Sequence, residues 1–554
     1  MRRARGRAGL GGCLVAGLLG CGPATPRDAG TDLGALDAIV APDLPWVHPD
    51  VPDDAGMGSS DGAIPRDRPS VDRELPDDPR VNVLVTDGLR GEGLPCKLTI
   101  EGVEGTRDPH FGEGDQRGVM VDRDNRAIAT GRWVLMPRGR ASFMLPPGRY
   151  RFRVTRGTEY DQLDLGVVNH DGRRGPTLRG ELHRVVNTEG EVSAEFHVHS
   201  EPSFDCDVPL EQRVLSLAVE GVEVFASTDH DIAGDFRPAI RFLGLERHIH
   251  WMKGDEITAD GFGHFGAYPL PEAVDPARDL THDEPNLMAI LDRARRVAPG
   301  VILQLNHPMW NEYPIGYWSL AGFDPTTGMS RMALSSLFDT VEVWNGHNLN
   351  EPLEFNADVD QVIDTWMATL QLGFRAAAVG NSDSHRLTHN PPGWPHNYLR
   401  VANDDPGEVT DAMVTMALRA RDVSLTSGPY LQLRVNNRRP GELAPGPEAR
   451  VSVEVQAPAW IPLDTVEIIA NRRVMANLTV TATPERGLVR QRFELPLPLR
   501  RDAWVLARTR ARAPLDRTVG APARPMPSLA LTNPVYVDFD NNGRYEPPGI
   551  QGGP

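Results

Sequence analysis

The sequence has few lysines, few cysteines and no long apolar segment. Lys97 and Lys253 are the only lysines in 554 residues, and the net charge is −18. Binding to nucleic acid needs clusters of Lys and Arg against the phosphates, and no basic stripe is present, so nucleic acid is not expected as a partner. No segment is apolar over the roughly 20 residues that a transmembrane helix requires.

The N-terminus has the features of an export signal. Four arginines within the first seven residues precede an apolar run at 8–20, which has the length of a signal-peptide core. The run ends in Leu18-Leu19-Gly20-Cys21, which resembles the lipobox of bacterial lipoproteins, where cleavage before the cysteine leaves a thiol that is acylated. We therefore expect residues 1–20 to be a lipoprotein signal peptide and Cys21 to carry the lipid. The protein would be exported and held on the periplasmic or surface face of the bacterial cell envelope, with the lipid as its only membrane anchor.

Residues 21–80 are expected to form a disordered tether. Between residues 22 and 80, 13 Asp and Glu stand against 5 Arg, a net charge of −8, in a stretch rich in Pro, Ala and Gly. Such a segment buries too little apolar surface to offset the entropy of ordering it. Of the 4 cysteines, only Cys96 and Cys206 then remain for the folded part. A disulfide between them is possible but not required, and we expect two buried or free thiols.

The folded part is expected to begin and end with small all-β sandwich domains, at 81–190 and 431–554. Apolar and polar residues alternate in short runs such as 81–87, and turns rich in Pro and Gly separate these runs. The same alternation returns after residue 430, for example at 451–455. Short alternating strands without a helical period are typical of β-sandwiches.

Between residues 191 and 430 apolar strands alternate with amphipathic helices. Strands are predicted at 194–198, 222–226, 249–252, 262–268, 301–305, 340–344 and 376–379. Helices are predicted between several of them, for example at 209–220, 285–297 and 358–372. Seven strands with intervening helices predict a parallel α/β barrel, in which sites form at the C-terminal ends of the strands.

The first of these strands carries a His-x-His pair. In an extended strand His197 and His199 point to the same face, about 6.5 to 7 Å apart along the backbone. Two imidazoles placed in this way can chelate one metal ion. A lone pair of this kind is a weak signal, because two polar residues on the wet face of a strand look the same.

Metal-type side chains recur at the ends of the later strands, and this recurrence predicts a metal site. If the strand ends share one rim, these residues converge although they span nearly 190 positions. The candidate ligands are His197, His199, Asp205, His230, Glu256, His264, His307, Asp383 and His385.

Together these motifs resemble the PHP superfamily, named for its polymerase and histidinol phosphatase domains, over about residues 191–430. The resemblance implies a distorted (β/α)7 barrel with a site for two or three metal ions. Within the superfamily, the segments around His197 and His264 and the Ser427-Gly428-Pro429 turn are similar to the carbamate-hydrolase-like branch, often labelled the CehA/McbA type.

The resemblance also implies how the ligands are shared among the ions. One ion would be held by His197, His199, Glu256 and Asp383; Glu256 would bridge to a second ion held by His264 and His307; and a third ion would lie among Asp205, His230 and His385. Asp205 occupies a position that is His in some members, so occupancy by two ions stays open.

The expected chemistry is hydrolysis. Imidazoles and carboxylates without a thiolate suit Zn²⁺, Mn²⁺ or Fe²⁺. Two or three such ions lower the pKa of a bridging water from near 15.7 toward about 7, so a metal-bridging hydroxide can act as the nucleophile. We expect a small-molecule ester as substrate, first a phosphomonoester or phosphodiester, with a carbamate or amide as the alternative. Arg386 is a candidate for binding a phosphate oxygen, although a surface salt bridge fits it equally well.

Several roles stay undecided between two interpretations. Amidohydrolase barrels also begin with His-x-His but use a carbamylated lysine, for which only Lys253 lies near a strand end. Glu342 either faces the site or forms an internal ion pair, and Asp229 either orients a ligand or caps a helix. Trp310 either walls a pocket or belongs to the core. Finally, the barrel could be an inactive scaffold in a cell-surface binding lipoprotein, although nine metal-type residues at strand ends argue against this.

Overall fold

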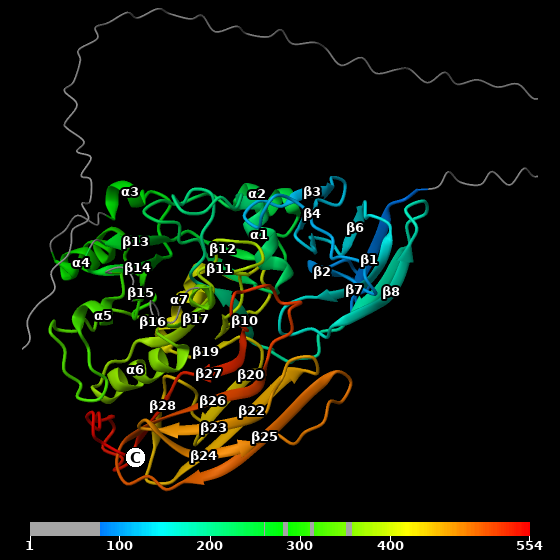
Figure 1. Cartoon of the computed structure of the whole chain (residues 1–554). Coiled ribbons are helices and arrows are strands. Elements are labelled where there is room, and N and C mark those ends of the chain that lie inside the picture. The colour runs from blue at the N-terminus through cyan, green and yellow to red at the C-terminus, as the bar shows by residue number, and fades with distance from the viewer. Residues whose placement is uncertain (1–77, 260, 281–285, 311–314, 351–356) are drawn as a thin grey trace, which may run out of the picture. The chain divides into compact units, whose positions relative to one another are not determined.

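The computed structural model describes residues 78–259, 261–280, 286–310, 315–350 and 357–554. They belong to one compact unit of mixed α/β structure, rich in strands and with few helices (Figure 1). The predicted signal peptide, Cys21 and nearly all of the predicted tether lie outside the described residues. Within the described part, no helix has both the length and the apolar character needed to cross a bilayer.

The first nine strands form two sheets around one hydrophobic core. One sheet has the order β6-β1-β9 and the other the order β3-β4-β5-β2-β7-β8. Alternate residues of β1, beginning with Val81 and Val83, face the core because successive side chains of a strand point to opposite faces. The core joins Val83 of one sheet to Leu98 of the other, which is consistent with the predicted sandwich. The strands are β1 Val81–Asp87, β2 Cys96–Gly102, β3 Val119–Asp122, β4 Ala127–Thr130, β5 Trp133–Met136, β6 Arg140–Phe143, β7 Gly148–Thr155, β8 Leu163–His170 and β9 Thr177–Leu182.

The central part begins with three parallel strands, β10 Glu191–Glu195, β11 Val224–Ala226 and β12 His250–Met252. Two helices connect them, α1 Leu210–Val219 and α2 Arg237–Leu243, and their apolar faces pack in one cluster. Five further strands form a separate sheet: β13 Asp255–Ala259, β14 Gly263–Tyr268, β15 Ile302–Leu305, β16 Thr340–Asn345 and β17 Ala377–Asn381.

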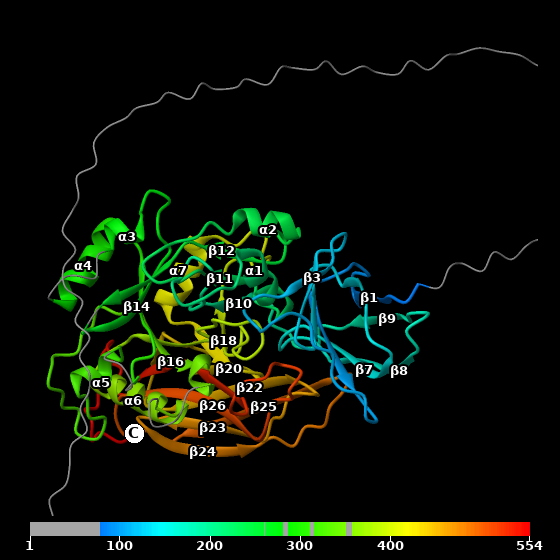
Figure 2. The ribbon, with the colours of Figure 1, turned by 45° about the horizontal axis from the view of Figure 1, so that its top comes forward.

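Helices lie along one side of the β13–β17 sheet (Figures 1 and 2). Ile290 of α4 and Trp366 of α6 pack in the same buried cluster as Phe265 of β14 and Val341 of β16. The elements in this region are α3 Pro276–Asp279, α4 Leu287–Val297, α5 Tyr317–Ala321, the short 3₁₀ helix η1 Gly346–Leu349 and α6 Val359–Gln371.

Two isolated parallel bridges join the two central sheets near the predicted ligands. Val198 pairs with Ser384, and His230 pairs with Glu256. A buried cluster also takes side chains from strands of both sheets, among them Val192, Val224, Met252, Tyr268, Ile302 and Val379. The strands of both sheets therefore border a shared interior.

Strand β14 departs from the expected parallel arrangement. It pairs antiparallel with both β13 and β15, whereas β15, β16 and β17 are parallel to one another. β13 ends at Ala259 and β14 begins at Gly263. So short a connection makes a hairpin, because a parallel crossover needs a dozen or more residues. The expectation of seven parallel strands is wrong at this strand.

The sheet that contains β10 continues into the C-terminal part. Its order is β12-β11-β10-β18-β19-β27-β26-β23-β24, and Ser424 of β19 pairs with Thr532 of β27. This sheet therefore takes strands from both sides of the predicted boundary between residues 430 and 431, and the boundary itself lies inside another strand, β20. A second sheet, β20-β22-β25, shares a core with it, which is consistent with a sandwich-like arrangement. The elements are β18 His396–Arg400, α7 Asp411–Ala420, β19 Val423–Thr426, β20 Tyr430–Val435, β21 Leu443–Pro445, β22 Ala449–Pro458, β23 Thr465–Ala470, β24 Arg473–Thr479, β25 Leu488–Leu497, β26 Ala503–Pro514, β27 Pro527–Thr532 and β28 Val535–Asp538.

Candidate metal centre

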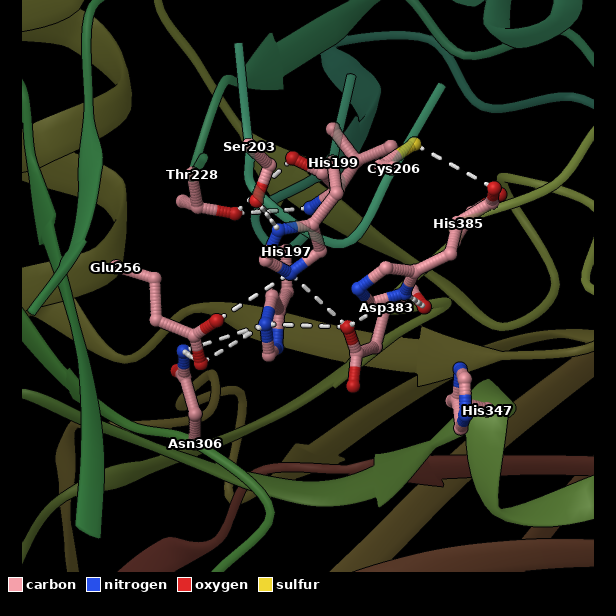
Figure 3. A network of polar contacts seen from close by, with 12 residues as sticks. His197, His199, Ser203, Cys206, Thr228, Glu256, Asn306, His347, Asp383 and His385 are labelled. Atoms are coloured by element: carbon pink, nitrogen blue, oxygen red, sulfur yellow. Dashed lines mark hydrogen bonds and ion pairs between the residues drawn. The ribbon is translucent and has the colours of Figure 1, made fainter. Parts of the chain in front are cut away.

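All nine predicted ligands lie together. They come from the segments that follow β10, β11, β15 and β17 and from β13 and β14 themselves, so six strands contribute to one cluster. Figure 3 shows His197, His199, Glu256, Asp383 and His385 directed toward one another. Four overlapping groups of side chains place their ligand atoms within 4.8 Å of one another: His197, Glu256 and His307; His197, His199 and Asp383; His230, Glu256 and His264; and His199, Asp205, His230 and His385.

Glu256 lies at the centre of the cluster. Its Oε1 is 3.1 Å from His197 Nε2 and 3.3 Å from His307 Nε2, and its Oε2 is 3.3 Å from His199 Nε2. His264 Nδ1 lies 3.4 Å from the same Oε1. A carboxylate shared in this way can bridge two ions. His264 groups with Glu256 and His230, whereas the family resemblance paired it with His307.

Asp383 and Asp205 supply the remaining carboxylates. Asp383 Oδ1 is 3.3 Å from His197 Nε2 and 3.1 Å from His199 Nε2. Asp205 Oδ2 is 3.2 Å from His230 Nε2 and 3.1 Å from His385 Nε2. The side chain of Asp205 is 32% exposed, whereas that of Glu256 is 1% exposed. The group around Asp205 is therefore the one that faces solvent.

These spacings fit metal ligands. Two atoms bonded to one ion at about 2.1 Å stand about 3.0 Å apart at a right angle and about 3.4 Å apart at a tetrahedral angle. His199 Nε2 and Asp383 Oδ1 lie within that range of each other, are buried, and have no hydrogen-bond partner. Burying such polar atoms without a partner is costly. A cation placed between them would satisfy both atoms, so the residues present fit a metal site.

The charges of the cluster are strongly coupled. Burial alone would raise the pKa of Glu256, but the imidazoles around it, His197 first, hold that pKa well below its usual range. Asp383 behaves in the same way. Burial opposes protonation of His197 and His199, yet the neighbouring carboxylates raise the pKa of both imidazoles well above its usual range. Without an ion, protons on these two histidines would compensate the buried carboxylates.

Glu342 of β16 forms an internal pair behind His197. Its Oε1 accepts a hydrogen bond from His197 Nδ1 at 3.0 Å, and its Oε2 accepts one from the His307 backbone N–H at 2.8 Å. Asn345 and Asn381 donate to the same carboxylate. A proton held on Nδ1 leaves Nε2 of His197 free to bind an ion, which is the usual role of a carboxylate behind a ligating histidine.

Other polar side chains hold the ligands in place. Thr258 Oγ1 lies 2.7 Å from His230 Nδ1. Asn306 donates to Glu256 Oε1 at 2.8 Å, and Asn345 donates to Asp383 Oδ2 at 2.9 Å. Asp229 accepts from Ser200, the residue after His199, so it supports this segment and does not cap a helix.

A closed circuit of rings surrounds the carboxylates. Consecutive centroid distances are His385 to His199 4.1 Å, His199 to His230 4.8 Å, His230 to His264 5.0 Å, His264 to His307 5.0 Å, His307 to Trp310 5.2 Å, Trp310 to His347 5.7 Å and His347 to His385 5.2 Å. Trp310 thus belongs to the wall of the centre. His347, at the start of η1, was not predicted as part of the centre, although it follows the end of β16 just as several candidate ligands follow the ends of other strands (Figure 3).

Arg386 makes a salt bridge with a residue far away in the sequence. Its Nη1 lies 3.1 Å from Asp115 Oδ1, in a loop of the N-terminal sheets, and His389 Nδ1 lies 2.5 Å from Asp115 Oδ2. The salt bridge that competed with phosphate binding is therefore present. Arg386 stays half exposed, so its other donors remain open to solvent.

Neither lysine of the chain belongs to the centre. Lys253 donates to the backbone oxygens of Glu272 and Val274, and Lys97 pairs with Glu220. A carbamylated lysine of the amidohydrolase type therefore has no candidate here. Cys206 is buried and free, and its thiol lies 3.4 Å from the backbone oxygen of His385. Cys96 is likewise buried and free, and burial raises the pKa of its thiol to about 12.

Comparisons with known proteins found only distant similarity. No family model and no curated protein matches the sequence. Among solved structures, the chain is similar to a "putative metal-dependent phosphoesterase" from Bifidobacterium adolescentis, with 16% identity, 41% of this chain and 95% of that chain covered, and a TM-score of 0.23. It is also similar to a β-glucuronidase from Bacteroides uniformis, with 11% identity, 84% and 58% of the chains covered, and a TM-score of 0.15. TM-scores this low do not establish a shared fold.

Proposed function

We propose that the protein is a metal-dependent hydrolase with a centre of the PHP type. The observation that carries the proposal is the convergence of nine imidazole and carboxylate side chains, with buried ligand atoms of His199 and Asp383 that lie 3.1 Å apart and make no hydrogen bond. Two or three divalent ions, Zn²⁺, Mn²⁺ or Fe²⁺, would be held there. When bound, such ions activate a water molecule at neutral pH and stabilise negative charge that grows on the substrate.

The fold that we propose around this centre is a distorted seven-stranded α/β barrel. Its strands would be β10, β11, β14, β15, β16 and β17, together with β12 and β13, which count as one strand. Support comes from the two bridges that link the sheets and from the buried cluster to which both sheets contribute. The reversed β14 and the continuation of one sheet into the C-terminal part are the distortions.

The residues of the chain have distinct tasks in this proposal. Glu256 and Asp383 keep their charges because the surrounding imidazoles lower their pKa values, so both carboxylates are available as ligands near neutral pH. Glu342 keeps the proton of His197 on Nδ1. Trp310 and His347 line one side of the centre.

The substrate that we propose is a small phosphomonoester or phosphodiester, with a carbamate or amide on the same centre as the alternative. Phosphoryl oxygens suit the divalent ions proposed for this centre, and the half-exposed Arg386 could add one donor. The finer placement in the carbamate-hydrolase-like branch rests on sequence motifs, so an aryl carbamate belongs in the same assay.

The test combines metal content with turnover. The purified protein is stripped of metal, reloaded with Mn²⁺ or Zn²⁺, and assayed with bis-p-nitrophenyl phosphate, p-nitrophenyl phosphate and a naphthyl carbamate, while elemental analysis counts the bound ions. Replacing His197 with Ala should abolish turnover and remove at least one ion. His183→Ala is the matched control, because this histidine is half exposed and pairs with Asp161 outside the centre. Absence of both turnover and bound metal would refute the proposal and favour a binding scaffold.

We further propose that the protein is exported and anchored to the cell envelope through a lipid on Cys21. Support comes from the arginine-rich start, the apolar run and the lipobox-like end of residues 1–21. The full-length protein should partition into the detergent phase, and mass spectrometry should find the added mass of acyl chains on the peptide that begins with Cys21. Cys21→Ser should move it to the aqueous phase, and equal partition of both proteins would refute the anchor.

A further inference from the structure

An exposed phenylalanine lies against the metal centre. The side chain of Phe204 is 80% exposed, and its ring stacks on the imidazole of His230 with centroids 4.8 Å apart and an angle of 27° between the planes. Phe204 immediately precedes Asp205, another member of the same group of ligands. One face of the phenyl ring is thus held by a candidate ligand.

The backbone around Phe204 holds the ring in this position. Ser203 N–H donates to the Ser200 oxygen at 2.9 Å, and Ser203 Oγ donates to Asp205 Oδ1 at 2.8 Å. The His230 N–H donates to Ser203 Oγ at 3.3 Å, which ties the turn to the segment that carries the imidazole. Cys206 then enters a small buried cluster with Val208 and Leu387. These contacts therefore fix the backbone of the turn that carries the Phe204 ring.

A ring in this place has an unusual environment. Single exposed apolar side chains are common on protein surfaces and need no special role. Phe204 differs because its neighbours on the same turn are buried or hydrogen-bonded, and because its partner is a candidate ligand and not an apolar residue. Ile232, two residues after His230, is also exposed, at 41%. Phe204 therefore places apolar surface next to Asp205, which has the most exposed side chain of the candidate ligands, at 32%.

We propose that Phe204 is a stacking platform for a planar aromatic group in the substrate's leaving group. The inference rests on the proposed function and makes it narrower: the substrate class is an aryl or nucleobase-bearing phosphoester. In the reaction, water adds to phosphorus, the bond between phosphorus and the leaving oxygen breaks, and the alcohol or phenol leaves with one proton from the water. Aromatic rings prefer offset-stacked or edge-to-face contacts, and the open side of Phe204 offers one.

The test compares two inhibitors that differ only in the ring. Phenylphosphonate and methylphosphonate carry the same phosphonate group, so the ratio of their inhibition constants on the metal-loaded protein isolates the contribution of the aromatic group. Phe204→Ala should raise the inhibition constant of phenylphosphonate roughly 3- to 10-fold, the loss expected for one ring contact, and should leave that of methylphosphonate within about 2-fold. Phe204→Leu should behave like the alanine variant, and Phe204→Trp should keep the phenyl preference. Phe242→Ala is the control, because Phe242 is an exposed ring that packs against Arg126 outside the centre.

The outcomes separate this inference from the proposed function. Equal weakening of both inhibitors with loss of bound metal would mean that Phe204 only supports His230, and the platform would be refuted. An unchanged ratio in Phe204→Ala would refute it as well. A wild-type protein that binds metal and hydrolyses phosphoesters without preferring the phenyl compound would refute the platform alone. Absence of metal and of turnover in the wild type would refute the proposed function, and the inference with it.

Discussion

Replacing Glu342 with Gln would test whether the centre depends on the carboxylate behind His197. The substitution keeps the shape of the side chain but removes its charge and turns one oxygen into an N–H₂ group. In the wild-type protein the carboxylate accepts hydrogen bonds from His197 Nδ1, the His307 backbone and two asparagines. An amide has one oxygen for these four donors. At least one buried donor therefore loses its partner.

The magnitude follows from two effects. Removing a partner of this kind behind a ligating histidine weakens metal binding by roughly 10- to 100-fold, which is about 1.4 to 2.7 kcal/mol. A buried donor without a partner also costs about 1 to 3 kcal/mol of folding stability, with or without metal. Metal at 100 times the wild-type Kd stabilises the wild-type protein by about 2.7 kcal/mol, whereas a variant that binds 100-fold more weakly gains only about 0.4 kcal/mol.

The assay is competition for metal against a coloured chelator, combined with urea unfolding at fixed free metal. Glu342→Gln should weaken metal binding and lose most of the metal-dependent stabilisation. Glu467→Gln is the control, since this carboxylate pairs with Arg508 on β23 and β26, away from the centre. Wild-type metal affinity in Glu342→Gln, or an equal loss in Glu467→Gln, would show that Glu342 does not hold His197 for metal binding.

Three further results are expected. Chelation should lower Tm, because the ions bind the folded cluster and not the unfolded chain, and a Tm unchanged by chelator in metal-loaded protein would contradict this. In the metal-free protein the raised pKa values of His197 and His199 contribute stability that is fully present below about pH 6.5 and is lost as the pH rises through the folded-state pKa values. The free energy of unfolding of the metal-free protein should therefore fall toward alkaline pH, while its affinity for metal rises. Urea unfolding and metal titration across pH 6 to 9 would check both trends. Arg213→Met should destabilise the protein by about 3 kcal/mol or more, because the buried guanidinium donates to the His199 oxygen and to Ser384; a loss below about 1 kcal/mol in urea unfolding would contradict it.

A loop of the N-terminal sheets contacts the segment that follows β17. Asp115 in one of their loops accepts hydrogen bonds from Arg386 and His389, just after the candidate ligand His385. The backbone oxygen of Asp115 also accepts the Leu387 N–H at 2.7 Å. The segment that carries Asp383 and His385 is therefore supported from outside the central sheets.

Local sequence pattern determined where the candidate ligands would be found. The period of two of an extended chain predicted that His197 and His199 share a face; both follow β10, and Val198 between them makes a bridge to Ser384. The other candidate ligands were predicted from their positions after or within apolar runs of strand length. The same patterns predicted α1, α4 and α6 to within about two residues, because amphipathic periods and caps are local properties. The donor types, imidazole and carboxylate, also came from the sequence alone.

Tertiary structure decided what those residues contact. The reversal of β14, the continuous sheet from β19 to β27 and the pairing of Glu342 with His197 depend on contacts between segments far apart in the chain, which no local period encodes. For the same reason no local pattern marks Phe204, whose ring meets His230 only in the folded chain. The chemical types of the candidate ligands could be predicted because side-chain type and strand period are local properties of the sequence. The contacts of each candidate ligand depend on how distant segments pack.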